Sequence, residues 1–215
     1  MSSLNLSCEQ ELALEALRGK VKALLSEKRY AHTASVEKTA TVLAEILIPT
    51  CVYNVRVAAI LHDVTKELPV DTHIELLKSS GIPLSEEDTA TEGVLHSFSA
   101  PEYCRLNFAE YVNNDILSAI KNHTVGAPDM TVFDKIVFIS DFIEETRRYE
   151  ACIETRRWLL TQLPLAQGYE AKARCLDEAC LMAILATEKS LNFKGAKINS
   201  RMLLTKDSLM QSTKQ

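Results

Sequence analysis

The 215-residue chain has little glycine and proline, six of each, and almost no alternation of apolar and polar residues. Half-buried strands need that alternation and tight turns favour those two residues, so the sequence argues against a β-rich fold. Apolar residues instead recur at helical spacing along most of the chain. With 47% hydrophobic residues, the chain is long enough to form one sizeable core. We predict an all-α fold: a single helical bundle with additional C-terminal helices.

The chain also lacks the marks of export and of membrane insertion. Its first thirty residues carry Glu9, Glu11 and Glu15 and no basic start followed by an apolar core, which argues against a signal peptide. No stretch approaches about 18 consecutive apolar residues, so no membrane span is expected. The six cysteines are dispersed without a C-x-x-C pair, which favours reduced thiols over a zinc finger. We therefore expect a cytoplasmic protein.

An excess of basic residues is absent as well. Lys and Arg number 24 against 29 Asp and Glu, which gives a net charge of −5. Proteins that bind nucleic acid usually show the opposite balance, so no nucleic-acid partner is expected. An anionic substrate would need local positive charge, supplied by a metal ion or by clustered Arg and Lys.

The apolar spacing predicts a series of helices separated by loops that contain Gly, Pro or polar residues. The residues from 53 to 63 are nearly all apolar, so this short helix should be central. Asp71 is the expected N-cap of a later helix, and the tail after Lys194 is expected to be polar and frayed. The expected helices are 9–26, 32–48, 53–63, 71–78, 85 towards 96, 114–123, 131 or 133 to 145, 151–163 and 168–192.

The most unusual feature of the sequence is the pair His62-Asp63, which directly follows the apolar run Val57–Leu61. Lys66 follows one turn later. Burying an imidazole or a carboxylate without a partner costs several kcal/mol, so two such groups at the end of an apolar run need an explanation. A metal ion provides one, because it neutralises the carboxylate and accepts the imidazole lone pair.

Other candidate ligands lie elsewhere in the chain. His32, His96 and His123 each lie at or near the end of an apolar helical run, and Asp141 lies within a strongly apolar helix. Taken alone, each histidine fits a core or helix-end position, and Asp141 fits an N-cap or a buried ion pair. Four histidines and two aspartates at apolar helix positions would hardly converge on one core by accident. A site of imidazoles and carboxylates suits Fe, Mn, Co or Zn. The remaining histidine, His73, lies among polar residues and is expected to be solvated.

The ordered set of these ligands resembles the HD-domain metal phosphohydrolases. The flanking residues more narrowly resemble the YqeK-like symmetrical bis(5′-nucleosyl)-tetraphosphatases of bacteria, which cut diadenosine tetraphosphate into two ADP. The HD pair alone is a weak motif, whereas the whole ordered set is specific. The resemblance covers roughly residues 20 to 160, and its segments are Arg29–Thr33, Leu61–Lys66, His123–Thr131 and Asp134–Glu144.

This resemblance implies a site with two divalent transition-metal ions, iron first and Mn, Co or Zn as alternatives, in a homodimer. His32, His62, Asp63 and Asp141 would hold one ion. Asp63 would bridge to a second ion held by His96 and His123. Asp63 and Lys66 would be the catalytic residues, and Lys66, Thr124 and Arg147 would bind the nucleotide substrate.

Three departures from the family pattern bear on the nucleotide. The usual Thr-Thr-Gly-Arg-Pro reads Thr124–Pro128 here with Ala127 in place of Arg, so a possible phosphate clamp is missing. The stretch after His96 differs, and the usual Ile-Glu-Pro-x-Arg keeps Arg147 but loses its proline. The metal ligands are intact. Thr124 also fits a turn cap and Arg147 a surface residue. The base could pack on Tyr30, Phe98 or Tyr103, which also fit a core.

The leading hypothesis is therefore symmetrical hydrolysis of dinucleoside polyphosphates by a water activated between two metals. A deoxynucleoside monophosphatase, a guanosine polyphosphate hydrolase and a nucleoside triphosphatase are alternatives, and a non-catalytic module that binds metal and nucleotide is another. A cyclic dinucleotide phosphodiesterase is less favoured, since no Gly-Tyr-Pro follows the HD pair. We expect residues 1–28 to form an N-terminal helix of the same domain, 29–160 the phosphohydrolase core and 161–215 a C-terminal helical extension with a polar tail.

Overall fold

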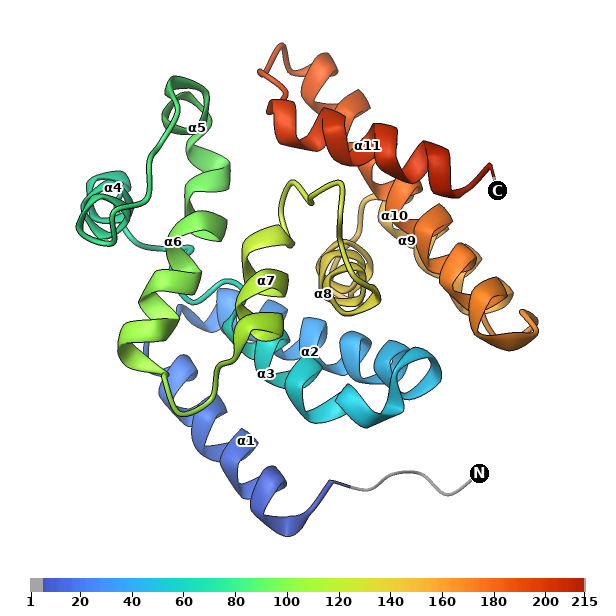
Figure 1. Ribbon diagram of the computed structural model, residues 1–215, viewed down its shortest axis with the longest axis horizontal. Coiled ribbons are helices and arrows are strands. Elements are labelled where there is room, and N and C mark those ends of the chain that lie inside the picture. Colours follow the sequence, from blue (N-terminus) through green and yellow to red (C-terminus); the bar gives the residue numbers. More distant parts are fainter. Residues whose placement is uncertain (1–5, 215) are drawn as a thin grey trace.

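The computed structural model describes residues 6–214, and within this range it contains α-helices, one 3-10 turn and no strand, which confirms the predicted all-α class (Figure 1). No described helix has the length and apolar character needed to cross a membrane. Residues 1–5 of the expected N-terminal segment lie outside the described residues. The helices are α1 (Cys8–Lys22), α2 (Glu27–Leu47), α3 (Val52–Leu61), α4 (Val70–Ser79), α5 (Glu86–Ala90), α6 (Glu92–Asn107), α7 (Asn114–Asn122), α8 (Val132–Ile143), α9 (Glu150–Gln162), α10 (Gly168–Phe193) and α11 (Ser200–Ser212), with the 3-10 turn at Pro49–Cys51.

The short helix α3 lies at the centre of the bundle, as its sequence predicts. It packs against α1, α2, α7 and α8, so apolar residues are tolerated on every side of it. Ala58, Ala59 and Leu61 are fully buried there. Small residues allow the neighbouring helices to approach closely, which places the end of α3 deep inside the protein.

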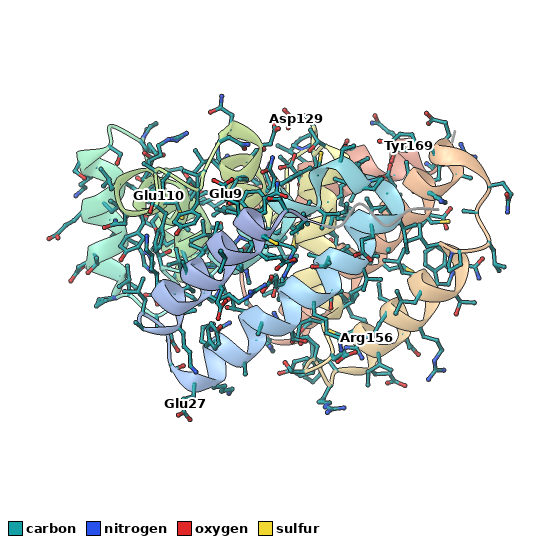
Figure 2. The ribbon with its side chains drawn as sticks, turned by 90° about the horizontal axis from the view of Figure 1, so that it is seen from below. Glu9, Glu27, Glu110, Asp129, Arg156 and Tyr169 are labelled. Atoms are coloured by element: carbon teal, nitrogen blue, oxygen red, sulfur yellow. The ribbon has the colours of Figure 1, made fainter. Side chains whose placement is uncertain are left out.

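Side-chain caps fix where the helices of the core begin. At the start of α2, the Ser26 hydroxyl accepts a hydrogen bond from the backbone N–H of Arg29. At the start of α7, the Asn113 side chain accepts one from the backbone N–H of Ile116. Thr131 and Asp134 form a capping box at the start of α8. In Figure 2 the first residue of α2, Glu27, lies at the lower edge of the molecule, and Asp129, in the loop before α8, lies at the upper edge.

Three expectations about the middle of the chain are wrong. The helix α4 begins at Val70 with Pro69 at the N-cap position, so Asp71 lies inside the first turn and is not the cap. His73 is buried rather than solvated, because α4 packs against α6 and the His73 Nδ1 atom lies 2.7 Å from the Ser99 hydroxyl. The helix expected from 85 towards 96 is interrupted at Thr91 and forms α5 and α6.

The expectation of a frayed tail after Lys194 is also wrong. Asn199 caps α11, which packs against α10 (Figure 1). Met202, Thr205 and Leu209 are the buried residues of α11 and lie on one face of the helix. Leu203, Leu204 and Met210 of the same helix are exposed, so apolar residues lie on both faces and the amphipathic pattern is weak.

Candidate metal centre

The pair His62-Asp63 lies in the turn immediately after α3, and the other predicted ligands converge on it from four further segments. His32 comes from α2, His96 from α6 and Asp141 from α8, while His123 follows the last residue of α7. His62 is fully buried, and Asp63, His96 and His123 are at most 3% exposed. Polar groups buried this deeply require partners, so the contacts among them are informative.

One half of the cluster consists of His32, His62 and Asp141. The His32 Nε2 atom lies 3.0 Å from an Asp141 carboxylate oxygen. The His32 and His62 rings meet edge to face with centroids 5.5 Å apart. One potential ligand atom from each of the three residues lies within 4.8 Å of the others, which is compact enough to surround one ion.

The other half consists of His96 and His123. Their Nε2 atoms lie 3.0 Å apart. The Oδ1 atom of Asp63 lies 3.3 Å from the Nε2 atom of His96 and 3.6 Å from that of His123. These three groups therefore place two nitrogens and one oxygen within 3.6 Å of one another.

The two carboxylate oxygens of Asp63 face different halves of the cluster. While Oδ1 faces His96 and His123, Oδ2 lies 3.5 Å from the Nε2 atom of His62 and 3.7 Å from that of His32. Oδ2 also accepts a hydrogen bond of 2.8 Å from Arg29. A carboxylate placed in this way can bridge two cations.

Hydrogen bonds from the Nδ1 atoms fix the orientation of three imidazoles. The Nδ1–H groups of His62 and His123 donate to the backbone carbonyls of Ala59, at 2.7 Å, and Ile120, at 2.6 Å. The Nδ1 atom of His32 lies 3.1 Å from the buried carboxylate of Glu144. Each arrangement leaves the Nε2 lone pair directed at the cluster, as is typical of metal-binding histidines.

The Nε2 atoms of His32 and His62 are buried and make no hydrogen bond, because each faces a carboxylate oxygen, which has no proton to donate: that of Asp141 for His32 and that of Asp63 for His62. A buried nitrogen with a free lone pair is unfavourable unless a ligand satisfies it. Imidazole nitrogens and carboxylate oxygens in this arrangement suit a divalent metal ion, so the residues present fit the expected cofactor. The cluster is therefore suited to bind a divalent metal ion.

The charges around the cluster favour ionised carboxylates. Burial alone would raise the pKa of Asp63, but the neighbouring His62 and His123 hold it well below its usual range. Burial would also raise the pKa of Asp141, and there His32 and Arg147 outweigh burial and lower it. Both carboxylates are therefore anionic at neutral pH, as metal ligands must be.

A cavity of about 450 Å³ opens onto the cluster. Lys66 lines it, with its Nζ atom 3.2 Å from both ring nitrogens of His96, and burial lowers the pKa of this lysine. The Thr124 hydroxyl lies 3.0 Å from the His123 Nε2 atom and 3.1 Å from that of His96. Arg147 reaches the same cavity and donates to Asp141 at 2.7 Å. These three side chains surround the space beside the candidate ligands.

The structure thus brings the six candidate ligands together with Lys66, Thr124 and Arg147. The Thr124 hydroxyl contacts the imidazoles of His96 and His123. These contacts contradict the alternative in which Thr124 only caps a turn. The aromatic walls of the cavity are Phe138, Phe142 and Tyr149, in place of the expected Tyr30, Phe98 and Tyr103. Which aromatics reach the cavity depends on how α8, α9 and α10 pack, and local sequence does not encode that packing.

Two residues of the site escaped the sequence analysis. Arg29 hydrogen bonds to Asp63, and its position one turn before His32 was the available signal. Glu144 is fully buried, and it accepts hydrogen bonds from the backbone N–H and the hydroxyl of Thr146 in addition to its contact with His32. The only sequence signal for Glu144 was its position directly after the apolar helix α8.

Ala127, which stands where the family pattern has arginine, does not line the cavity beside the metal cluster. Ala127 lines a separate cavity of about 340 Å³ together with Phe98, Lys121 and Arg201. The cavity beside the candidate ligands does not include it. The missing arginine therefore changes the lining of a different cavity.

Comparison with known proteins gives concordant results. The family model described as HD domain matches residues 29–146. The chain is 33% identical over 143 residues to a Bacillus subtilis (strain 168) protein named "Bis(5'-nucleosyl)-tetraphosphatase, symmetrical", with 66% of this chain and 75% of the relative covered. A Halalkalibacterium halodurans protein of the same name is 34% identical over 145 residues, with the same coverage.

A solved structure is also similar along nearly the whole chain. It is a protein from Clostridium acetobutylicum described as a predicted HD superfamily hydrolase involved in NAD metabolism. The TM-score is 0.79 at 28% sequence identity, and the match covers 92% of this chain and 96% of the other. The similarity therefore extends past the family model into the C-terminal helices.

Proposed function

This chain belongs to the HD domain family, and we propose that it is a hydrolase that splits dinucleoside tetraphosphates symmetrically, converting diadenosine tetraphosphate and water into two ADP. The observation that carries the proposal is the placement of Asp63 between two histidine groups. A shared carboxylate between two sets of nitrogens is the arrangement that two-metal phosphohydrolases require. The names of the two bacterial relatives support the choice of substrate.

The proposed cofactor is a pair of divalent transition-metal ions, with iron as the first candidate and Mn, Co or Zn as alternatives. His32, His62, Asp63 and Asp141 would hold one ion, and His96, His123 and Asp63 the other. When bound, such a pair activates water as a nucleophile and neutralises charge on the phosphates. The buried Nε2 atoms that lack hydrogen bonds support this assignment.

The remaining side chains bind and orient the tetraphosphate. Lys66 and Arg147 supply positive charge at the cavity wall, which an acidic protein needs in order to bind a polyphosphate. The Thr124 hydroxyl donates a hydrogen bond to a phosphate oxygen beside the His96 and His123 pair. Asp63 and Lys66 are the catalytic residues in this proposal, because both face the phosphate that is attacked.

The cavity also offers surfaces for a nucleoside. Phe138, Phe142 and Tyr149 line it, and Tyr149 is 75% exposed, so its ring is free to stack on a base at the cavity mouth. Lys194, at the end of α10, lines the same cavity and can contact a distal phosphate. The C-terminal helices therefore contribute to the proposed substrate site.

Product analysis tests this proposal directly. Purified protein supplied with Fe²⁺, Mn²⁺ or Co²⁺ should convert diadenosine tetraphosphate to ADP alone. AMP together with ATP would reject symmetrical cleavage. If this substrate is inert while a nucleoside triphosphate or a deoxynucleoside monophosphate is hydrolysed, one of the alternative phosphohydrolase functions is correct.

Replacing Asp63 tests the mechanism. The Asp63→Ala variant should keep its helical circular dichroism spectrum and lose turnover, because it removes ligands from both halves of the site. Full activity in that variant would contradict the two-metal mechanism. The expected homodimer remains a prediction, which light scattering of the purified protein can test.

A further inference from the structure

The helix α11 contacts the segment that follows the candidate ligand His123. The Thr205 hydroxyl lies within hydrogen-bonding distance of the backbone carbonyl of Val125, at 3.0 Å, and of the carbonyl of Arg201 in its own helix, at 2.8 Å. The Ser208 hydroxyl donates to the carbonyl of Pro128 at 2.5 Å. Figure 1 shows α11 beside α10, near the loop that joins α7 to α8.

The contact at Thr205 is close and specific. Thr205 is fully buried, and it packs against Gly126, which has a φ angle of +72°. A Cβ atom added at Gly126 would lie 2.5 Å from the Thr205 methyl carbon. Only glycine combines this backbone conformation with so close an approach. The loop and the helix therefore fit in a single arrangement.

The start of α11 is attached to a second segment of the site. Ser200 donates two hydrogen bonds to Glu87, from its backbone N–H at 2.8 Å and from its hydroxyl at 2.5 Å. The Arg201 guanidinium lies 4.9 Å from the centre of the Phe98 ring and 3.6 Å from Asp88. Phe98 follows His96 by two residues in α6.

The contacts of α11 thus join the two segments that carry His96 and His123. The other candidate ligands are held elsewhere: His62 by the carbonyl of Ala59, and His32 by Glu144. This division places α11 on one half of the metal centre only.

We propose that Thr205 is a positioning residue, through which α11 holds the loop of Thr124 and Val125 so that His96 and His123 can bind the second metal ion. This inference rests on the proposed two-metal function and assigns a role to the C-terminal helix. Thr205 acts through the Val125 carbonyl and does not touch the metal or the substrate.

Titration of the metal-free full-length protein with Mn²⁺ tests the inference. The Thr205→Val variant keeps the shape of the side chain and removes the hydroxyl. It should bind the second Mn²⁺ up to about 10-fold more weakly, because Thr205 acts on His123 only through the loop, whereas a direct outer contact of a ligand is worth about 10- to 100-fold. The first ion should be affected much less. Electron paramagnetic resonance should show single Mn²⁺ ions where the wild type shows a coupled pair.

Two further variants separate the hydroxyl from a general loss of packing. Thr205→Ser keeps the donor and should retain the second ion. Thr39→Val is the matched control, because the Thr39 hydroxyl bonds only to the carbonyl four residues earlier in α2. It removes the same bond within a helix without touching the loop, and it should leave both ions unaffected.

Gly126 gives an independent test from the other side of the contact. Gly126→Ala should weaken the second ion, and combining it with Thr205→Ser, which removes the opposing methyl group, should restore part of the loss. A general loss of stability would weaken the binding of both ions alike. Unchanged affinity for both ions in Thr205→Val, equal weakening of both, or failure of the rescue would overturn the inference. Because these experiments measure metal binding, failure to cleave diadenosine tetraphosphate would contradict the proposed function alone.

Discussion

The Nε2 atoms of His96 and His123 face each other at a distance of 3.0 Å. The Nδ1–H of His123 is already bound to the Ile120 carbonyl, so its Nε2 atom carries a lone pair. Burial, together with the nearby Lys66, holds the pKa of His96 well below its usual range, so its ring is neutral. Two buried Nε2 atoms this close share either a proton or a metal ion, and the carboxylate of Asp63 beside both of them favours the metal ion.

Removing metal should therefore destabilise the protein. When its free concentration is about 100 times its dissociation constant, each bound ion raises the free energy of unfolding by about 2.7 kcal/mol. For a chain of this size that corresponds to roughly 5–10 °C in Tm. Thermal unfolding with and without a chelator measures the difference, and readdition of Mn²⁺ should restore it. An Asp63→Ala variant should respond weakly to both treatments, whereas equal Tm values for the treated and untreated wild type would show that no metal is bound.

Lys66 should act mainly on substrate binding. Its Nζ atom faces the cavity beside His96, so Lys66→Ala removes a positive charge next to the phosphates. Hydrogen bonds to charged groups are worth about 1.5–3 kcal/mol, so KM for diadenosine tetraphosphate should rise by about 10-fold or more. Lys38→Ala, which removes an exposed lysine paired with Glu145, is the control. Unchanged KM in Lys66→Ala would exclude its phosphate role.

Glu144 should control metal affinity through His32. The carboxylate contacts the His32 Nδ1 atom at 3.1 Å, and Glu144→Gln weakens that contact with almost no change in size. Loss of such an outer partner lowers metal affinity about 10- to 100-fold. Mn²⁺ titration should show this effect, and Glu145→Gln, at the exposed neighbouring position, should show none. Equal affinity in both variants would mean that Glu144 only fills space.

Asp88 should make the attachment of α11 sensitive to acid. Burial would raise the pKa of Asp88, but hydrogen bonds from Ser85 and Asn199 outweigh it and lower the pKa below its ordinary value of 3.8. A lowered pKa in the folded state means that the ionised form stabilises the protein above about pH 4. This stability is lost as the pH falls through the folded-state pKa.

The variant Asp88→Asn isolates this contribution. Compared by urea unfolding, wild type should be more stable than Asp88→Asn by a constant amount above about pH 5. The difference should shrink as the pH falls below 4. A difference that does not change with pH would show that the Asp88 charge contributes nothing to the stability.

The six candidate ligands that the structure brings together were recognisable in the sequence because each one is an ionisable residue in or beside an apolar run. His62 and Asp141 are recognisable from their neighbours alone, since few other reasons place such groups beside buried residues. The central position of α3 was predictable for the same reason. These features depend on local sequence, which a single chain provides.

The parts that were missed depend on contacts between distant segments. Arg29 and Glu144 are ordinary charged residues until the fold places them against Asp63 and His32. Thr205 lies in a helix with apolar residues on both faces, so its buried face is identified only by the packing of the Gly126 loop against it. His73 was misjudged because its polar neighbours in sequence are not its neighbours in space.

Because one carboxylate, that of Asp63, faces both halves of the centre, the affinities of the two ions should be thermodynamically linked. The first ion to bind fixes the Asp63 carboxylate in an orientation that the second ion also requires. By linkage, the coupling free energy is the same whichever ion binds first. The dissociation constant of each ion should therefore depend on whether the other ion is bound, and by the same factor in both directions.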